Sequence, residues 1–380
     1  MKYDYWYSLD GNRPTPRLWG LDIPETEDPG LPNTLFEIHG LELERWHVDQ
    51  PQQDLPQAVI QNLVQHPGST VLIMAASEYT RAYESSYEHT YRKWVKRHRI
   101  RPNQITVIVC SDSLRDRGKR LFPDLTWGVY DYWEHQPRLW FEEWHCAGDL
   151  PEPDRRFTCL NRRPHEMRAA LYTDLMTVRA YRHTAYHTMG NRNYHNFDTA
   201  EMDLEVIRSG GNDPINYLDS DIERSAAEFY RNPQTHEAPG EPISFQDRSL
   251  FDISAQGCLN IITESYPNQR QHSPTEKTYR AYAVARPHIT FAHCHWESAN
   301  LQPRGYHSYP WDTDVDACRD PAKRYRLCRD RILRWAEMSK EDFDQEMAYP
   351  LHIAQLNHAH WLHKTSDEYI HNRLPESLRP

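Results

Sequence analysis

Short apolar runs alternate with amphipathic segments in the first part of the chain. Residues 71–76 and 105–110 are six-residue, mostly apolar runs that suit buried strands, and 56–66 and 85–98 place apolar side chains at helical spacing. The first of these helices is expected to bury Val59, Ile60, Leu63 and Val64. Buried strands separated by helices are typical of a parallel sheet covered on both faces, so the pattern predicts a doubly wound α/β fold.

The alternation resumes after an acidic, proline-containing stretch at 148–154, which marks a predicted domain boundary. Strands are predicted at 157–160, 258–262 and 289–292, and helices at 164–178, 274–285, 321–335 and 339–363. We expect Pro350 to kink or split the last helix, because proline cannot donate a helix hydrogen bond. The prediction is two Rossmann-like domains, residues 1–150 and 151–335, with C-terminal helices at 336–380 that pack back across both.

Composition narrows the functional classes. The 44 Lys and Arg residues against 55 Asp and Glu residues give a net charge of −11, which opposes nucleic-acid binding except through a local basic patch. The 7 cysteines form no CxxC pair, so reduced thiols are expected. No apolar run approaches the ~20 residues of a membrane span, and the first residues do not read as a secretory signal. We therefore expect a cytoplasmic protein without a membrane partner. Walker A, GxGxxG, GxSxG and HExxH motifs are absent.

Two predicted helices begin with cations, which the helix dipole disfavours by up to ~1 kcal/mol. Arg162, Arg163 and Arg168 surround one start, and Lys277 and Arg280 follow the other. Both starts come after a predicted strand, at the edge where open α/β sheets bind ligands. Solvated surface charge explains either group alone. Their repetition favours a diphosphate site built from backbone amides, helix dipole and cations.

Two carboxylates lie at the same predicted edge. Glu264 follows the strand at 258–262, where it can accept hydrogen bonds from ribose or sugar hydroxyls or be an exposed loop acid. Glu276 stands three residues after Ser273, the spacing of a capping box, so it serves either a ligand or the helix start.

A family resemblance rests on these segments. Residues 262–265 (ITES), 275–281 (TEKTYRA) and 287–289 (PHI) resemble the donor-binding stretch of the α-1,3-fucosyltransferases and of related virus-encoded glycosyltransferase-like proteins. Residues 157–161 (FTCLN), followed by Arg168, resemble an earlier strand and helix of that family. The similar region covers about residues 156–289. Arg286 and the run from His293 to Glu297 depart from the family pattern, so the resemblance assigns neither the donor base nor the sugar.

The resemblance implies a GT-B glycosyltransferase that needs neither a metal nor another cofactor. Residues 151–335 would bind a nucleotide-diphosphate sugar, and residues 1–150 would present the acceptor. Arg168 and Lys277 would hold the diphosphate, and Glu264 and Glu276 the ribose or donor sugar. The full set of predicted donor-binding residues is Asn161, Arg163, Arg168, Glu264, Glu276, Lys277 and Arg280.

An inverting transferase needs a base that deprotonates the acceptor hydroxyl. Glu78 and Asp112 follow predicted strands of the first domain and are the predicted catalytic residues, Glu78 first; His135 is a further candidate. A retaining mechanism would need no such base, and the sequence leaves both open.

A run of cations and two clusters of histidines outside the predicted donor site permit other interpretations of the function. Arg92, Lys93, Lys96 and Arg97 belong to a basic run that ends at Arg101 and is either a solvated helix face or a nucleic-acid patch. With the patch, the acceptor would be a hydroxylated base in DNA; without it, a glycan. His293, Cys294 and His295, like His358, His360 and His363, are weighed as zinc ligands, but no metal is predicted. The alternative to an enzyme is a binding or virion-associated protein that has the same fold but catalyses no reaction.

Overall fold

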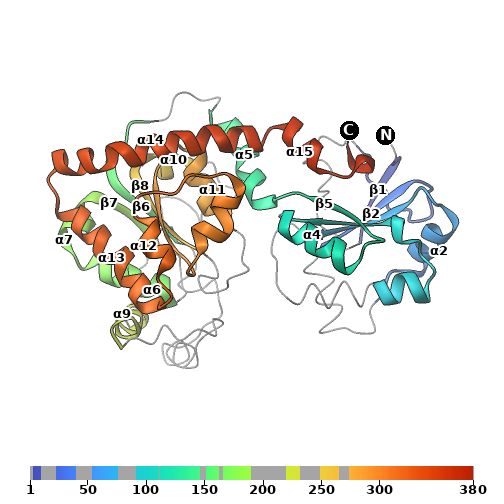
Figure 1. Ribbon diagram of the computed structural model, residues 1–380, viewed down its shortest axis with the longest axis horizontal. Coiled ribbons are helices and arrows are strands. Elements are labelled where there is room, and N and C mark those ends of the chain that lie inside the picture. Colours follow the sequence, from blue (N-terminus) through green and yellow to red (C-terminus); the bar gives the residue numbers. More distant parts are fainter. Residues whose placement is uncertain are drawn as a thin grey trace. The chain divides into compact units, whose positions relative to one another are not determined.

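The computed structural model of the protein describes residues 3–9, 23–39, 54–75, 91–110, 112–145, 151–161, 166–189, 220–231, 249–264 and 274–379. These residues form an α/β protein with two parallel sheets, one in each of two compact units (Figure 1). Unit 1 comprises Met1–His135, Gln271–Ser273 and His363–Pro380, and unit 2 comprises Gln136–Arg270 and Pro274–Leu362. A Rossmann-like arrangement in two parts agrees with the sequence pattern.

The sheet of unit 1 has five parallel strands in the order β1-β2-β3-β4-β5. The strands are β1 (Tyr5–Ser8), β2 (Thr34–His39), β3 (Thr70–Ala75), β4 (Ile105–Val109) and β5 (Thr126–Val129). The helical segments between them are α2 (Gln57–Gln65), η2 (Tyr91–Arg97), η3 (Pro102–Gln104) and α4 (Asp112–Leu121). The prediction of β3, β4 and α2 is confirmed. Among the strands that the structure describes, however, this order does not reverse, so the doubly wound pattern is not seen in unit 1.

Successive side chains along β3 point to opposite faces of this sheet, and both faces are covered. Val71 and Ile73 pack in the core that contains α2, whereas Leu72 and Met74 point to the other face and pack with Ile370. Ile370 belongs to α15 (Asp367–Arg373), so the C-terminal segment covers a face of the unit 1 sheet. The prediction for Val64 was wrong: its side chain is 48% exposed, because α2 turns only a narrow face to the sheet.

The sheet of unit 2 has four parallel strands in the order β7-β6-β8-β9. Its strands are β6 (Arg155–Asn161), β7 (Ala185–Met189), β8 (Gly257–Thr263) and β9 (His288–Phe291). The chain moves outward from β6 to β7 on one side, and from β8 to β9 on the other. The order therefore reverses between β6 and β8, which is the topological switch point where open α/β sheets bind ligands beside the strands' carboxyl ends.

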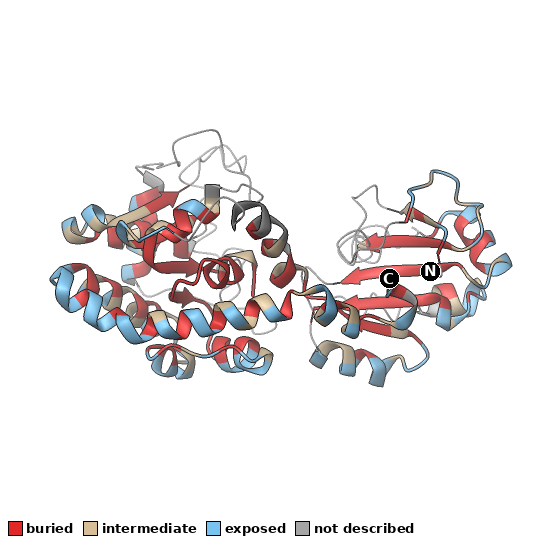
Figure 2. Ribbon diagram, turned by 90° about the horizontal axis from the view of Figure 1, so that it is seen from above, coloured by how far each residue is buried: buried red, intermediate tan, exposed pale blue. Residues whose placement is uncertain are grey.

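Helices cover the unit 2 sheet, whose strands are mostly buried (Figure 2). They are α6 (Glu166–Met176), α7 (Arg179–Thr184), α9 (Ser220–Arg231), α10 (Ser249–Gln256), α11 (Glu276–Ala283), α12 (Asp312–Ala317) and α13 (Pro321–Glu337). Two π-helical or 3-10 segments, η5 (Glu297–Leu301) and η6 (Gln302–Arg304), follow β9. Two helices, α5 (Tyr132–His145) and α14 (Lys340–Lys364), carry the chain from one unit to the other.

The last long helix is not split at Pro350, so the split, one of the two outcomes expected for this proline, does not occur. Helix α14 runs through 25 residues with Pro350 in its interior. Phe343, Met347 and Ile353 on this helix are buried in the core of unit 2. Their packing offsets the cost of about 3 kcal/mol that an interior proline carries. No helix among the described residues is long and apolar enough to cross a bilayer.

Candidate functional site

The carboxyl ends of β6 and β8 hold three connected side chains at the switch point. Arg168, from α6, is 4% exposed and donates hydrogen bonds from Nε to Thr263 Oγ1 and from Nη2 to the Thr263 carbonyl, both at 3.0 Å. The Thr263 hydroxyl in turn donates to Asn161 Oδ1. Asn161 and Arg168 thus meet at the strand end that the sequence predicted for them.

The neighbouring strand β7 holds Asn161 in place. The backbone N–H of Asn161 donates to Thr188 Oγ1 at 3.1 Å, and the Nδ2 atom of Asn161 lies 3.4 Å from His187 Nε2. His187 Nδ1 lies 3.1 Å from the Tyr181 hydroxyl. All four residues are buried, which gives this edge of the sheet a preorganised polar lining.

Glu264 links β8 to the beginning of α11. Its carboxylate accepts hydrogen bonds from the Thr275 backbone amide at 3.3 Å, the Thr275 hydroxyl at 2.7 Å and the Thr278 hydroxyl at 2.7 Å. Only 1% of Glu264 is exposed. The exposed-loop alternative is therefore wrong, and the carboxylate holds the helix start.

Lys277 and Glu276 form the first turn of α11. Lys277 Nζ lies 2.8 Å from Glu276 Oε1 and 3.3 Å from Thr275 Oγ1. Burial acts to raise the pKa of Glu276, but Lys277 and then Arg280 outweigh it and lower that pKa, so the carboxylate is ionised at neutral pH. Thr275 is the N-cap residue, so Glu276 is the first residue of the helix and does not have the third position that a capping box with Ser273 requires.

Arg280 is held in the interior of unit 2. Its Nε donates to Ser254 Oγ of α10 at 3.0 Å, and burial lowers its pKa although Glu276 acts in the opposite direction. Arg286, where the resembling family has a small residue, donates to the carbonyls of Ala255 at 3.1 Å and Pro151 at 2.6 Å. Both arginines therefore tie α11 and the following turn to neighbouring backbone and side chains.

Continuous contacts connect the two cationic groups. Arg168 binds Thr263, the adjacent Glu264 binds Thr275, and Thr275 accepts from Lys277. A guanidinium, an ammonium and the N-terminus of α11 therefore belong to one network at the switch point. Such a network suits an anion with several oxygen atoms.

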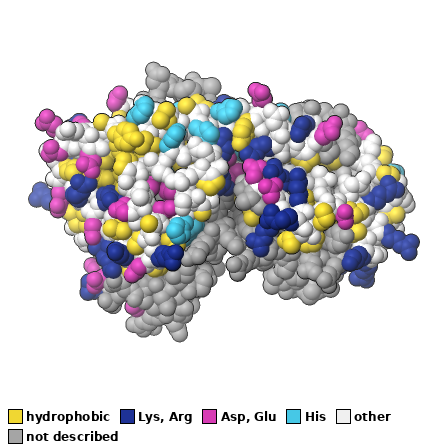
Figure 3. Space-filling model, viewed as in Figure 1, with side chains coloured by type: hydrophobic (Ala, Val, Ile, Leu, Met, Phe, Trp, Pro, Cys, Tyr) yellow, Lys and Arg dark blue, Asp and Glu magenta, His cyan; other side chains and the backbone are white. Residues whose placement is uncertain are grey.

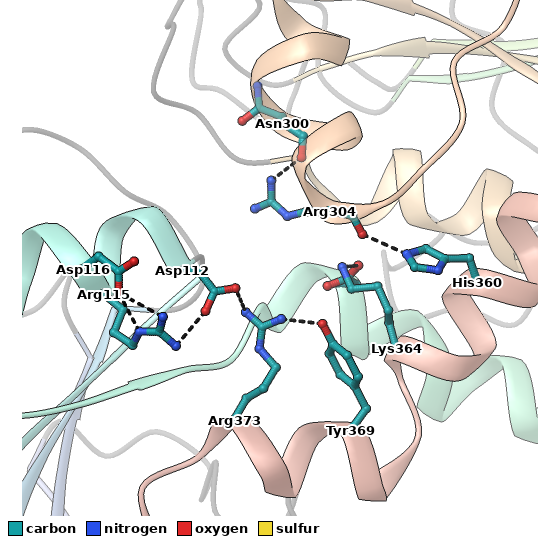
Figure 4. Close-up of polar contacts among 10 residues, drawn as sticks. Asp112, Arg115, Asp116, Asn300, Arg304, His360, Lys364, Tyr369 and Arg373 are labelled. Atoms are coloured by element: carbon teal, nitrogen blue, oxygen red, sulfur yellow. Dashed lines mark hydrogen bonds and ion pairs between the residues drawn. The ribbon is translucent and has the colours of Figure 1, made fainter.

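In unit 1, Asp112 begins α4 just after β4. Its carboxylate lies 2.7 Å from Arg115 Nη1 and also accepts from Arg373 Nη2, whose Nη1 donates to the Tyr369 hydroxyl at 2.5 Å (Figure 4). To act as a base, this carboxylate would have to take the proton of an acceptor hydroxyl while two guanidinium groups stabilise its ionised form. Glu78 and Arg163 lie outside the residues that the structure describes.

His135 lies in the first turn of α5, directly beyond β5. Its Nδ1 is 2.5 Å from the Asp131 carbonyl, which can only accept, so the proton is on Nδ1 and Nε2 carries a lone pair. The ring is buried next to the Lys364 backbone and stacks on Tyr130 at 4.6 Å. Burial lowers the pKa of His135, so the imidazole is neutral at pH 7.

The same turn contains a buried ion pair. Lys364 Nζ lies 2.7 Å from Glu134 Oε1, and each side chain is 4% exposed. Buried ion pairs are costly to break, because removing one partner leaves a charge in the interior.

The basic run lies at the other end of the unit 1 strands. Residues 91–101 directly precede β4, so they lie near its amino end, whereas Asp112 follows its carboxyl end. Lys93 lies 3.6 Å from Asp54, while Lys96 and Arg97 are exposed. The side chain of Arg92 lies outside the described set. Figure 3 shows further Lys and Arg side chains over α4, which contains Arg115, Arg117, Lys119 and Arg120.

The zinc interpretations find no support in the described part of the chain, where no group of three His, Cys, Asp or Glu side chains is arranged to hold a metal. His358 Nδ1 lies 2.9 Å from the Tyr282 carbonyl and His360 Nε2 lies 2.8 Å from the Arg304 carbonyl. His293 Nδ1 is 2.5 Å from the carbonyl of Cys294. These rings therefore serve backbone carbonyls.

Sequence reasoning missed the threonines of this site. Thr263, Thr275 and Thr278 supply the hydroxyls that join Asn161 and Glu264 to the helices. Thr275 before an acidic first turn was a visible N-cap signal. Nothing in the sequence indicated that Thr263 would bridge two distant segments.

No protein-family model matches the chain, and no curated protein sequence matches it. Among solved structures, the chain is similar to the N-terminal domain of trehalose-6-phosphate phosphatase from Candida albicans, with a TM-score of 0.42 and 11% sequence identity. The similarity covers 90% of this chain and 69% of that one.

Proposed function

We propose that the protein is a metal-independent GT-B glycosyltransferase that binds a nucleotide-diphosphate sugar at the carboxyl edge of the unit 2 sheet. The observation that carries the proposal is the network from Arg168 through Thr263, Glu264 and Thr275 to Lys277 at the switch point. The resemblance of residues 262–289 to a donor-binding stretch supports the same assignment.

The proposed chemistry follows from the charge that develops on the leaving group. When the bond between the sugar's anomeric carbon and the diphosphate oxygen breaks, negative charge grows on the leaving nucleoside diphosphate. Arg168, Lys277 and the amides of the α11 N-terminus would stabilise that charge in place of a divalent ion. Glu276 would accept hydrogen bonds from ribose or sugar hydroxyls, while Glu264 keeps the helix start in position.

On the acceptor side, an inverting reaction moves one proton. The acceptor oxygen forms the new bond to the anomeric carbon, the diphosphate leaves, and the hydroxyl proton goes to a base. His135 is the candidate base that the structure describes best, a neutral imidazole whose Nδ1 is held by the Asp131 carbonyl. Asp112, held by two arginines, is the weaker candidate, and Glu78 stays a prediction.

The decisive experiment is a thermal-shift panel of nucleoside diphosphates and their sugars. A ligand at ~100 times its dissociation constant adds about 2.7 kcal/mol of stability, so one base should raise Tm clearly. The stabilising nucleotide sugar is then incubated with the protein, and release of free sugar shows turnover. If no nucleotide stabilises the protein, the donor site is rejected.

A nucleotide that binds without turnover would instead support the rival proposal, a binding protein that keeps the fold. The acceptor is a glycan or a hydroxylated base in DNA. The basic run does not favour DNA, because β4 separates it by about 16 Å, five residues at ~3.3 Å each, from the carboxyl edge where Asp112 and His135 lie.

A further inference from the structure

Four polar side chains meet inside unit 2, between α11, β9 and the segments before α12. Tyr282 comes from α11, His288 from β9, Glu297 from η5, and Tyr309 from the turn that precedes α12. The His288 ring lies 5.2 Å from the Tyr282 ring and 5.0 Å from the Tyr309 ring, both edge to face. Glu297 interacts electrostatically with both tyrosines.

Three of the four have a buried polar atom that no described residue satisfies. The atoms are the Tyr282 hydroxyl oxygen, His288 Nε2 and Glu297 Oε1, in residues that are at most 5% exposed. The fourth, the Tyr309 hydroxyl, interacts with the Asn357 side chain. His288 uses its other nitrogen, Nδ1, with Thr290 Oγ1 at 3.0 Å.

Nearby groups are already engaged. The Asn357 amide interacts with the Tyr309 hydroxyl and also bonds the His307 backbone, and Asp312 Oδ2 accepts from the Tyr309 backbone amide at 2.7 Å. More than nine in ten buried polar groups in folded proteins have a hydrogen-bond partner, so the three remaining atoms together require an occupant.

The ionisation of the group limits the chemistry of that occupant. Burial raises the pKa values of Glu297 and the two tyrosines, and lowers the pKa of His288 to about 3. Burial thus favours the neutral form of each of the four side chains. A small neutral molecule that both donates and accepts hydrogen bonds suits such a group.

We propose that Tyr282, His288, Glu297 and Tyr309 enclose a site for ordered water. A buried water makes about three hydrogen bonds to protein groups. Water here would join α11 to β9 and to the segment before α12, and so would stiffen the helix whose first turn carries Lys277. The inference does not depend on the proposed function.

A crystal structure of the full chain near 1.5 Å resolution tests the occupant directly. We expect density refining as one or more full-occupancy waters within 3.2 Å of the three unsatisfied atoms. An empty or collapsed site would overturn the proposal, as would density with the short oxygen distances of a cation.

Variants test whether the occupant couples the side chains. Tyr282→Phe and Glu297→Gln should each lower Tm by about 2–4 °C, and the double variant should lower it by less than the sum, because both remove bonds to one shared network. Tyr349→Phe, at a tyrosine that is 64% exposed, is the matched control and should leave Tm unchanged. Additive shifts would contradict shared water. If replacing the sodium and potassium of the buffer by choline lowers the Tm of the wild type but not that of Glu297→Gln, the occupant is a cation and the water proposal is wrong.

Discussion

At the residue scale, the two cations assigned to the donor are held differently. Arg168 is 4% exposed and anchored on Thr263, whereas the Lys277 side chain is 16% exposed and lies against Glu276. Replacing Arg168 therefore disturbs the fold as well as binding, and Lys277 is the cleaner probe.

Lys277→Ala should weaken binding of the stabilising nucleoside diphosphate by about tenfold or more, because it removes a charge-assisted hydrogen bond worth roughly 1.5–3 kcal/mol. Arg168→Ala should do the same and also lower Tm. Calorimetry measures both affinities. Arg224→Ala, on α9 of the same unit with a side chain 72% exposed, is the control and should bind normally. Unchanged affinity in both site variants would remove the diphosphate assignment.

Asp312 gives the stability a pH dependence. Burial is the main cause that raises its pKa from 3.8 to about 8, so the folded state keeps a proton that the unfolded state has lost. This contribution is complete below pH 3.8 and disappears as pH rises towards 8. Between pH 7.0 and 8.0 the wild type should lose up to about 1.4 kcal/mol, seen as a fall in Tm. Asp312→Asn should show a smaller fall; an equal one would reject this assignment.

At the element scale, the candidate site depends on how α11 is held relative to β8. Glu264 at the end of β8 accepts three hydrogen bonds from the first turn of α11, and Arg280 ties the same helix to α10. Helix and strand are thereby locked in one register, which places the α11 N-terminus beside the carboxyl end of β8.

Glu264→Gln should lower Tm and weaken nucleoside diphosphate binding together, since an amide cannot accept from all three donors. We expect a loss of about 1–3 kcal/mol in stability. Thr278→Val removes one donor and should give a smaller loss in the same direction. If Glu264→Gln weakens binding with no change of Tm, Glu264 contacts the ligand directly and its structural role is secondary.

At the scale of the whole molecule, the −11 net charge and the placement of the basic run oppose a large nucleic-acid footprint. Each phosphate contacted on duplex DNA contributes about −0.9 to the slope of log affinity against log salt. Lys96, Arg97, Arg99 and Arg101 are the exposed members of the run, and the two that lie on its helix, Lys96 and Arg97, are the residues to test.

We expect duplex DNA to bind only at low salt. Replacing Lys96 and Arg97 by alanine should flatten the salt slope by about 2 without changing nucleoside diphosphate affinity. Gel-shift titrations at several salt concentrations, with modified and unmodified duplexes, measure this. A Lys340→Ala variant, at an exposed lysine of α14, is the control. A slope unaffected by the double replacement would show that the run is a solvated surface.

Turnover, once a donor is found, should survive EDTA, because Arg168, Lys277 and the α11 amides take the place of a divalent ion. The measurement is the release of sugar from the nucleotide sugar with and without the chelator. Loss of activity in EDTA that manganese restores would contradict the metal-independent mechanism.

Local patterns in the sequence were enough for the α/β class, the strands β3, β4, β6, β8 and β9, and the helix that begins at Glu276. Runs of apolar residues and helical spacing depend on neighbours along the chain, so they can be read without a structure. The cationic helix starts were visible for the same reason, because a charge at a helix N-terminus breaks a local preference.

Only the tertiary structure decided what those residues contact. The bonds of Arg168 to Thr263 and of Glu264 to Thr275 join segments 95 and 11 residues apart, and the reversal between β6 and β8 depends on which strands pair. Pro350 stays inside α14 because distant core residues pack against that helix. Strand order and long-range hydrogen bonds arise from packing between remote segments, which no local pattern encodes.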